Sequence, residues 1–179
     1  GFIGMPPMNF FDGAIKLVDG QMVFEEGKLT NTRAADAKAA AALSGKADSD
    51  EPVVLVGELT LPGNGFTLVI PDHLRDMLAG KVGSHVVLGI RPEHFHLTPV
   101  NGGAEIKVNL NVVEPLGNDM DVYMNTNLKE YVVGRVEART GLTMGAATVY
   151  VDAAKVHFFE PGATGMNLSL TKASAHANA

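Results

Sequence analysis

Residues 105–113 restrict the fold more than any other segment, because polar and apolar side chains alternate from Glu105 to Val112. Ile106, Val108, Leu110 and Val112 occupy every second position, with Lys or Asn between them. A period of two places all the apolar side chains on one face of a β-strand, whereas an amphipathic helix needs apolar residues three and four positions apart. The segment therefore predicts a strand with one buried and one solvated face and a well-specified register.

Similar short segments, separated by glycine-containing turns, extend the β pattern over most of the chain. The N-terminal pair, residues 14–18 and 21–24, is joined by Asp19-Gly20, which favours a hairpin because a two-residue type I′ turn needs positive φ at both central positions. The same pattern predicts strands at 53–61, 66–70, 84–91, 121–125, 131–137, 147–151 and 156–159. Many short strands at this spacing predict a mainly β protein with a barrel or sandwich architecture.

One short helix is predicted at residues 72–79. Asp72 stands where a side chain can cap the free backbone amides, Leu74 and Leu78 fall on one side, and Gly80 follows as a terminator. We expect this helix to pack at one end of a barrel.

Two stretches carry little apolar surface to bury. Residues 31–52 are rich in alanine and have strong helix propensity but almost no large apolar side chain, so we expect a mobile insertion on the surface. Residues 161–179 are small and polar, and we expect a frayed tail. The length of 179 residues suffices for one domain, or for two small β modules that share a core.

Charge and hydropathy exclude two classes of partner. The chain has 14 Lys and Arg against 20 Asp and Glu, a formal net charge of −6, and its basic residues are scattered singly. With no Trp and 6% aromatic residues it offers little stacking surface, so we expect no nucleic-acid partner. No apolar run approaches the roughly 18 residues of a membrane-spanning helix, so we expect no direct membrane insertion. The absence of cysteine suits a reducing cytoplasm.

The sequence contains no phosphate-binding loop of the Gly-Lys-Ser/Thr type. Its three Gly-Lys pairs are followed by Leu29, Ala47 and Val82, so none supplies the hydroxyl that would ligate Mg²⁺. A Gly-x-Ser-x-Gly nucleophile motif is also missing. We therefore expect no ATP hydrolysis, no catalytic residue and no cofactor in this chain.

Two pairs of residues suggest a metal site. His94 and His96 are two apart, so their rings would face the same way on an extended strand, and Asp119 and Asp121 offer carboxylates to a hard cation. Neither pair has an obvious third ligand in a chain without cysteine. An irregular segment and a solvated hairpin turn explain the same residues, and we predict no metal.

Four blocks of sequence occur in an order that is quite specific. Residues 1–4 (Gly-Phe-Ile-Gly) and 6–10 (Pro-Pro-Met-Asn-Phe) resemble the junction at which the ATPases of sugar ABC importers leave their nucleotide-binding domain. Residues 89–94 (Gly-Ile-Arg-Pro-Glu-His) and 113–119 (Val-Glu-Pro-Leu-Gly-Asn-Asp) agree with the same family, the maltose and glycerol-phosphate importer type. The resemblance runs from residue 1 to about residue 159. It departs at Met5, where the family commonly has a serine, and in an alanine-rich insertion longer than usual.

This resemblance implies a fold and an assembly. The fold would be OB-like β-barrel modules of the TOBE/MOP type, with residues 1–12 as the remnant of the junction and 13–160 as a regulatory domain. ATP and Mg²⁺ would bind in an N-terminal domain that the sequence does not include. The family implies a homodimer, permease subunits contacted through that missing domain, a possible regulatory protein, and a cytoplasmic, peripheral position on the membrane.

Within the matching blocks, six residues are candidate contacts with a partner subunit or a regulator: Arg91, Glu93, His94, Gly117, Asn118 and Asp119. A structural role competes in each block. Arg91 and Glu93 would form an ion pair or a backbone brace at a strand end. Gly117, Asn118 and Asp119 would form a tight turn. The functional alternative for this turn is a contact, because exposed loops often carry function.

An alternative to the regulatory role is the binding of a small ligand. Related barrels of molybdate and sulfate importers bind oxyanions at module interfaces, so the chain would be a small-ligand sensor. The 20 glycines favour this alternative, whereas the acidic balance opposes it.

Overall fold

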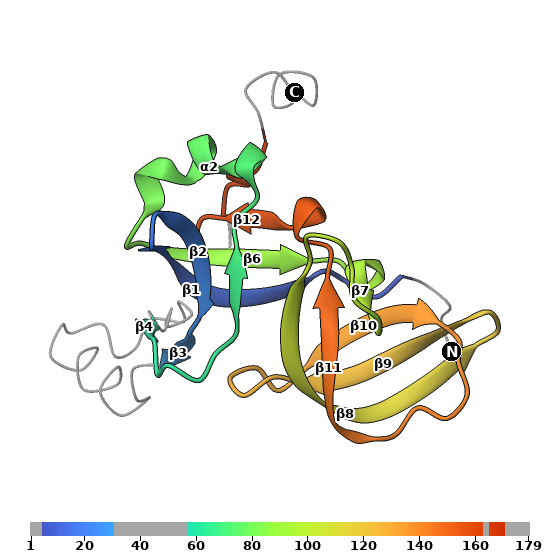
Figure 1. The fold of residues 1–179 in the computed structure, drawn as a ribbon. Helices are drawn as coiled ribbons and strands as arrows, with labels where there is room; N and C mark the ends of the chain where they lie inside the picture. The colour runs from blue at the N-terminus through green and yellow to red at the C-terminus, as the bar shows by residue number, and fades with distance from the viewer. Residues whose placement is uncertain (1–4, 31–56, 163–164, 171–179) are drawn as a thin grey trace, which may run out of the picture.

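The computed structural model describes residues 5–30, 57–162 and 165–170. Figure 1 shows that strands dominate it. The strands are β1 (Asn9–Val18), β2 (Gln21–Glu26), β3 (Lys28–Thr30), β4 (Glu58–Thr60), β5 (Thr67–Val69), β6 (His85–Ile90), β7 (Phe95–His96), β8 (Ala104–Leu116), β9 (Asp119–Asn125), β10 (Val132–Glu137), β11 (Gly145–Val151) and β12 (His157–Phe159). The helical elements are α2 (Asp72–Leu78) and the 3₁₀ turns η1 (Ala79–Lys81), η2 (Pro92–His94) and η3 (Ala153–Lys155). The predicted mainly β class with a short helix is confirmed.

The strands form two five-stranded sheets and one small ladder. The first sheet has the order β12-β6-β1-β2-β5 and the second the order β10-β9-β8-β11-β7, while β3 pairs only with β4. Figure 1 shows the first sheet next to α2 and the second as a strongly curved body beside it. Buried residues of both sheets, from Phe11 and Phe24 to Phe95 and Ile106, belong to one contiguous core. The two β modules therefore share that core.

The first sheet is built around β1, which pairs antiparallel with β2 and with β6. Its turn to β2 has positive φ at Asp19 (50°) and Gly20 (79°), which confirms the predicted hairpin turn. Leu74 and Leu78 of α2 are 1% and 0% exposed, so the helix closes the core at one end of this sheet, as predicted.

The predicted ends of that helix are wrong in detail. Asp72 is its first residue and does not cap it: Pro71 holds the N-cap position, and Leu74 N donates to Pro71 O at 3.0 Å. Asp72 instead lies 3.8 Å from the Arg75 guanidinium one turn further on, and its charge still favours the helix N-terminus. Gly80 does not end the helix but lies inside η1, which tightens the last turn.

The second sheet curls until its two edge strands meet. Gly134 of β10 lies against Phe95 of β7, and a Cβ at Gly134 would come within 3.3 Å of the Phe95 side chain. Glycine therefore lets the edges approach closely. The result is a nearly closed, barrel-like sheet, in agreement with the predicted OB-like module.

Of the four alternating apolar residues that predicted β8, three are buried as expected. Ile106, Val108 and Leu110 are buried, but Val112 is 55% exposed. The register between β8 and β9 shifts between Leu110 and Val112. A bulge of this kind inserts one extra residue and exchanges the two faces of the strand, so that Val113 turns inward instead.

Most other strands lie within a few residues of their predicted bounds. β1 is longer than predicted, because it starts at Asn9 rather than at residue 14. The short strands β3 and β7 were not predicted, since two or three residues are too few to show an alternation. The predicted insertion at 31–52 lies outside the described residues, as do 1–4 and 171–179.

The described part of the predicted tail is not frayed. Leu168 N donates to Phe158 O at 2.7 Å, and Phe158 N donates to the Ser169 hydroxyl at 2.8 Å. Residues 165–170 thus satisfy backbone groups along the otherwise free edge of β12.

None of the helices in the described ranges reaches the length and apolarity of a membrane-crossing segment.

Candidate functional site

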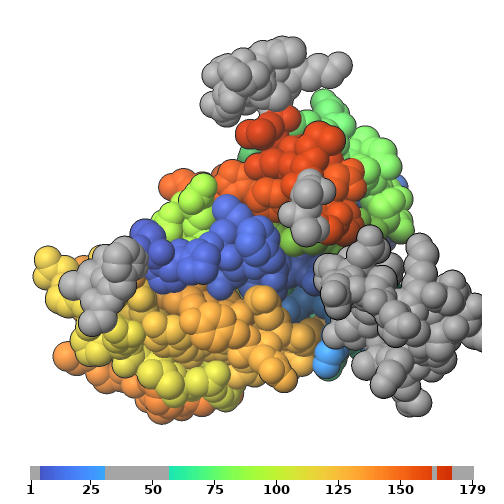
Figure 2. Space-filling view, turned by 180° about the vertical axis from the view of Figure 1, so that it is seen from behind, coloured from blue at the N-terminus to red at the C-terminus, as the bar shows by residue number. Residues whose placement is uncertain are grey.

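Asn9 joins the two sheets. Its side-chain amide donates to Ile90 O at 3.0 Å and to Val133 O at 2.9 Å, and its carbonyl oxygen accepts from Val133 N at 2.9 Å. The Asn9 side chain therefore bonds both backbone groups of Val133 in β10, as a neighbouring strand would. Figure 2 shows β1, in blue, between the second sheet below and the C-terminal strand region above. Asn9 lies in the block 6–10 that marked the family resemblance, but its role needed the tertiary structure.

Arg135 of β10 is the centre of a charged cluster on the second sheet. Its Nε and Nη2 donate to the two carboxylate oxygens of Asp121, at 2.7 and 3.0 Å, and Asp121 is 5% exposed. Its Nη1 lies 2.9 Å from the sulfur of Met5. The hydrogen bond to Asp121 raises the pKa of Arg135, and the charges of Asp121, Asp119 and Glu93 raise it further. The guanidinium is therefore held charged at the surface of the barrel.

The first block of predicted contacts forms η2, which connects the first sheet to the second. His94 N donates to Arg91 O at 3.0 Å, and Pro92 is buried. In the described part of the chain Arg91 and Glu93 form no ion pair with each other. Of the two structural roles considered for this block, the structure has the brace, in the form of a backbone turn. The Arg91 side chain is exposed.

The second block lies in the turn between β8 and β9. Gly117 has φ of 80°, which favours glycine, and Asn118 O accepts from Ala138 N at 2.9 Å. The predicted tight turn is confirmed, although Asp119 already belongs to β9. Gly117, Asn118 and Asp119 are exposed, and no hydrogen bond or ion pair engages the last two side chains within the described ranges.

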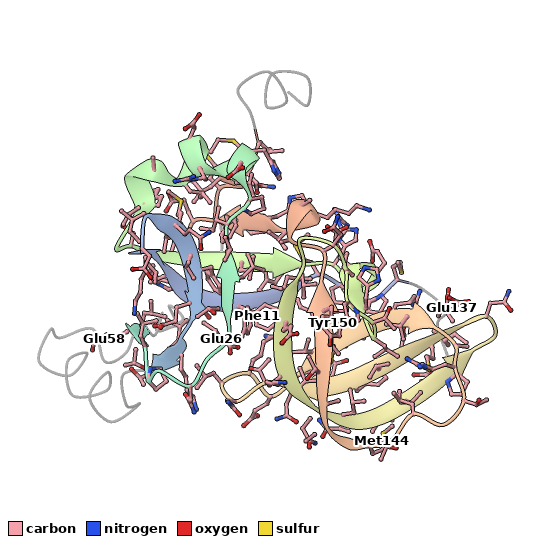
Figure 3. The ribbon with its side chains drawn as sticks, in the orientation of Figure 1. Phe11, Glu26, Glu58, Glu137, Met144 and Tyr150 are labelled. Atoms are coloured by element: carbon pink, nitrogen blue, oxygen red, sulfur yellow. The ribbon has the colours of Figure 1, made fainter. Side chains whose placement is uncertain are left out.

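Both blocks lie close to Arg135, since Glu93 and Asp119 each act on its pKa. A hollow of about 470 Å³ opens between η2, β7 and the end of β10, where Figure 3 labels Glu137. Its charged lining has both signs, with Glu93 and Glu137 beside Arg135 and Arg139. A lining of both signs suits contact with a protein surface better than it suits a single small ion.

The two residue pairs considered for metal do not converge. His94 and His96 line different hollows, so their rings do not face the same point. Both oxygens of Asp121 are engaged by Arg135 and are not shared with Asp119. Across the described ranges, no group of three His, Cys, Asp or Glu side chains is placed to hold a metal ion.

Glu26 is a buried carboxyl group that the sequence analysis missed. It is 1% exposed at the end of β2, and Figure 3 shows it with Phe11 on the side of the first sheet that faces the second. The Thr126 hydroxyl donates to Oε2 at 2.8 Å and Phe66 N donates to Oε1 at 3.3 Å. Burial raises the pKa of Glu26 despite both hydrogen bonds and the charge of Lys129. The alternation along β2 places Glu26 on the same buried face as Met22 and Phe24, but the predicted strand ended at residue 24.

Comparison with known proteins finds relatives of the kind that the sequence resemblance implied. The profile described as MalK OB fold domain matches residues 43–95. The chain is 30% identical over 167 residues to the oligosaccharides import ATP-binding protein MsmX of Bacillus subtilis. This alignment covers 89% of the chain and 34% of MsmX. It is 29% identical over 164 residues to the maltose/maltodextrin import ATP-binding protein MalK of Vibrio cholerae, covering 89% of the chain and 33% of MalK. It is 36% identical over 78 residues, 42% of the chain, to the sn-glycerol-3-phosphate import ATP-binding protein UgpC of Vibrio vulnificus, of which it covers 21%.

Among solved structures, the cytoplasmic molybdate-binding protein ModG aligns with a TM-score of 0.48 and 13% identity, covering 84% of the chain and 94% of ModG. The chain spans about one third of the length of MsmX and MalK. The family match and the relatives agree with the resemblance carried by residues 1–10, 89–94 and 113–119. Residues 43–95 thus match the MalK OB fold domain, and 89% of the chain is similar in sequence to the ATP-binding subunits of sugar ABC importers.

Proposed function

We propose that the chain is the regulatory and dimer-forming domain of the ATP-binding subunit of a sugar ABC importer. The observation that carries this proposal is the relation to MsmX over 89% of the chain, together with the MalK-type OB fold. In this proposal ATP and Mg²⁺ bind to a nucleotide-binding domain outside these 179 residues, through which the subunit contacts its permease at the cytoplasmic face of the membrane. The domain itself performs no chemistry.

Its contribution would be to hold two ATPase halves together while they open and close. A persistent contact between two copies keeps the halves at a high effective concentration and avoids repeating the entropy loss of association in every cycle. The exposed side chains of Arg91, Asn118 and Asp119, next to the mixed-charge hollow, are the proposed contacts with the second copy or with a regulatory protein.

Light scattering against protein concentration tests the dimer. We expect Asn118→Arg, which places a bulky charge in the exposed turn, to weaken association by about tenfold or more. Asn127→Arg is the matched control, because Asn127 is exposed and hydrogen-bonds only to Asn64 O at 2.8 Å. An association constant that is unchanged by Asn118→Arg would exclude this turn as the contact. ATP hydrolysis by the 179-residue chain would overturn the assignment of the chemistry to another domain.

A ligand-binding role is the second candidate function. The observation in its favour is a hollow that is lined by three histidines, a lysine and a serine and that lies away from Arg135.

A further inference from the structure

The hollow on the first-sheet side of the molecule has an unusual lining for an acidic chain. It encloses about 300 Å³, and its polar lining consists of His73 from α2, His94 from η2, Lys155 from η3, His157 from β12 and Ser169. We call it the histidine hollow. Three of the six histidines of the sequence meet in it, and among the described residues no carboxylate lines it, although the chain carries 20 Asp and Glu.

We propose that the histidine hollow binds a small oxyanion with two negative charges, of the class of phosphate and phosphate monoesters. This inference is argued separately from the proposed dimer contacts Asn118 and Asp119, which lie at the turn between β8 and β9. The third proposed contact, Arg91, is near enough to act on the pKa of His94 and His157.

The first argument is the hydrogen-bonding chemistry of the lining. Lys155 and the three imidazoles each carry N–H groups, the kind of donor that an oxyanion accepts from several directions. The Lys155 ammonium also lies 3.8 Å from a carboxylate oxygen of Asp152, which an anion would have to compete with. Ser169 has another role, because its hydroxyl accepts from Phe158 N at 2.8 Å and donates to Asn167 Oδ1 at 2.6 Å. It fixes the wall of the hollow instead of offering a free donor.

The second argument is an unpaired nitrogen on His94. Its Nδ1 is buried and has no hydrogen-bond partner within the described residues. A buried ring nitrogen without a partner costs free energy whether or not it carries the proton. In the tautomer with the proton on Nε2, that second nitrogen is the donor available to an oxyanion.

The third argument is the electrostatics around the histidines. Burial lowers the pKa of His94, as do the positive charges of Lys155 and Arg91, while the carboxylates of Glu93 and Asp152 raise it. Burial also lowers the pKa of His157, followed by the charges of Arg91 and His94. A bound anion would add negative charge beside these rings and would favour the protonated form of both.

The size of the hollow limits the ligand. About 300 Å³ is at the lower end of the range for small-molecule sites, roughly 300–1,000 Å³. Phosphate or a short phosphate monoester fits such a volume. The mixed-charge hollow beside Arg135 is a poorer anion site, because the carboxylates of Glu93 and Glu137 line it.

Calorimetric titration of the 179-residue chain with sulfate, inorganic phosphate, glycerol phosphate and, as a singly charged control, acetate tests the proposal. We expect one site for the dianions and none for acetate. Tighter binding of glycerol phosphate than of phosphate would identify a monoester ligand, and the reverse order would identify free phosphate. No heat with any dianion would overturn the proposal.

Lys155→Met and its matched control Lys28→Met distinguish binding in the histidine hollow from a general effect of net charge. Both lysines are exposed, and both variants remove one positive charge. Lys155→Met is expected to weaken sulfate binding by about tenfold, the usual loss for one charge-assisted hydrogen bond, while Lys28→Met leaves it unchanged. Equal weakening in the two variants would overturn the proposal.

The dependence on pH gives a second readout. Sulfate keeps both charges between about pH 8 and about pH 6, so a change in its affinity reports protonation of the protein. We expect tighter binding at the lower pH by about threefold or more, and a higher pKa of the His94 and His157 ring signals in NMR when sulfate is present. Ring signals that titrate identically with and without sulfate would contradict the proposed site.

Discussion

The carboxylate of Glu26 accepts a hydrogen bond of 2.8 Å from the hydroxyl of Thr126, across a separation of 100 residues in the sequence. The Thr126 hydroxyl oxygen also accepts from Leu128 N and Lys129 N, at 3.2 and 3.0 Å. The pair thereby ties the end of β2 to the turn between β9 and β10, and it joins the two sheets through a buried ionisable group.

Replacing Glu26 by Gln should change the pH dependence of stability. Burial raises the pKa of Glu26 above its ordinary value of 4.5, so the carboxyl favours folding below that value and this contribution is lost as the pH rises through the folded-state pKa. The free energy of unfolding of Glu26→Gln relative to the native chain should therefore increase with pH in that window, by at most about 1.4 kcal/mol per pH unit. Urea denaturation at a series of pH values measures it.

Thr126→Val provides the companion variant for that experiment. It removes the hydroxyl that lowers the pKa of Glu26, so the window in which stability falls should extend to higher pH. A pH-independent difference between Glu26→Gln and the native chain would show that Glu26 titrates normally in the folded state.

Asn9→Ala should destabilise the fold by about 2–5 kcal/mol, because it removes three hydrogen bonds and leaves Val133 N without its acceptor. Asn9→Asp keeps the acceptor but points a carboxylate at two carbonyl oxygens. We expect its cost to fall in acid, where protonation restores one donor. Denaturation with Asn127→Ala as the exposed control checks both, and a loss below about 0.5 kcal/mol for Asn9→Ala would contradict the bridging role.

Arg135→Met should cost about 3–5 kcal/mol, because Asp121 would remain buried without its bidentate partner. The double variant Arg135→Met, Asp121→Asn should recover part of that loss, since no unpaired charge is left behind. Chemical denaturation of the single and double variants gives the coupling free energy. If the losses simply add, the pair contributes nothing beyond its separate side chains.

The bulge in β8 predicts opposite behaviour for two residues that a regular strand would bury alike. Leu110→Ala should cost about 2–5 kcal/mol, because Leu110 is 1% exposed. Val112→Thr should change the free energy of unfolding by no more than about 0.5 kcal/mol, because Val112 is 55% exposed. Equal costs would place Val112 in the core and contradict the shifted register.

The sequence by itself determined the β class, the position of most strands, the Asp19-Gly20 turn and the family resemblance. These follow from local rules: alternation with a period of two, turn residues that tolerate positive φ, and motif order along the chain. The same rules found α2 from its apolar side, since Leu74 and Leu78 are spaced for one face of a helix.

Only the tertiary structure decided which polar groups meet. The partners of Asn9, Glu26 and Arg135 lie 14 to 130 residues away, so no local pattern identifies which groups these side chains meet. The bulge after Leu110 depends on how β9 pairs with β8, and the histidine hollow forms because the sheet order brings α2, η2, η3 and β12 together. Periodicity reports whether a side chain faces the core or the solvent, whereas contacts between distant segments depend on how the whole chain packs.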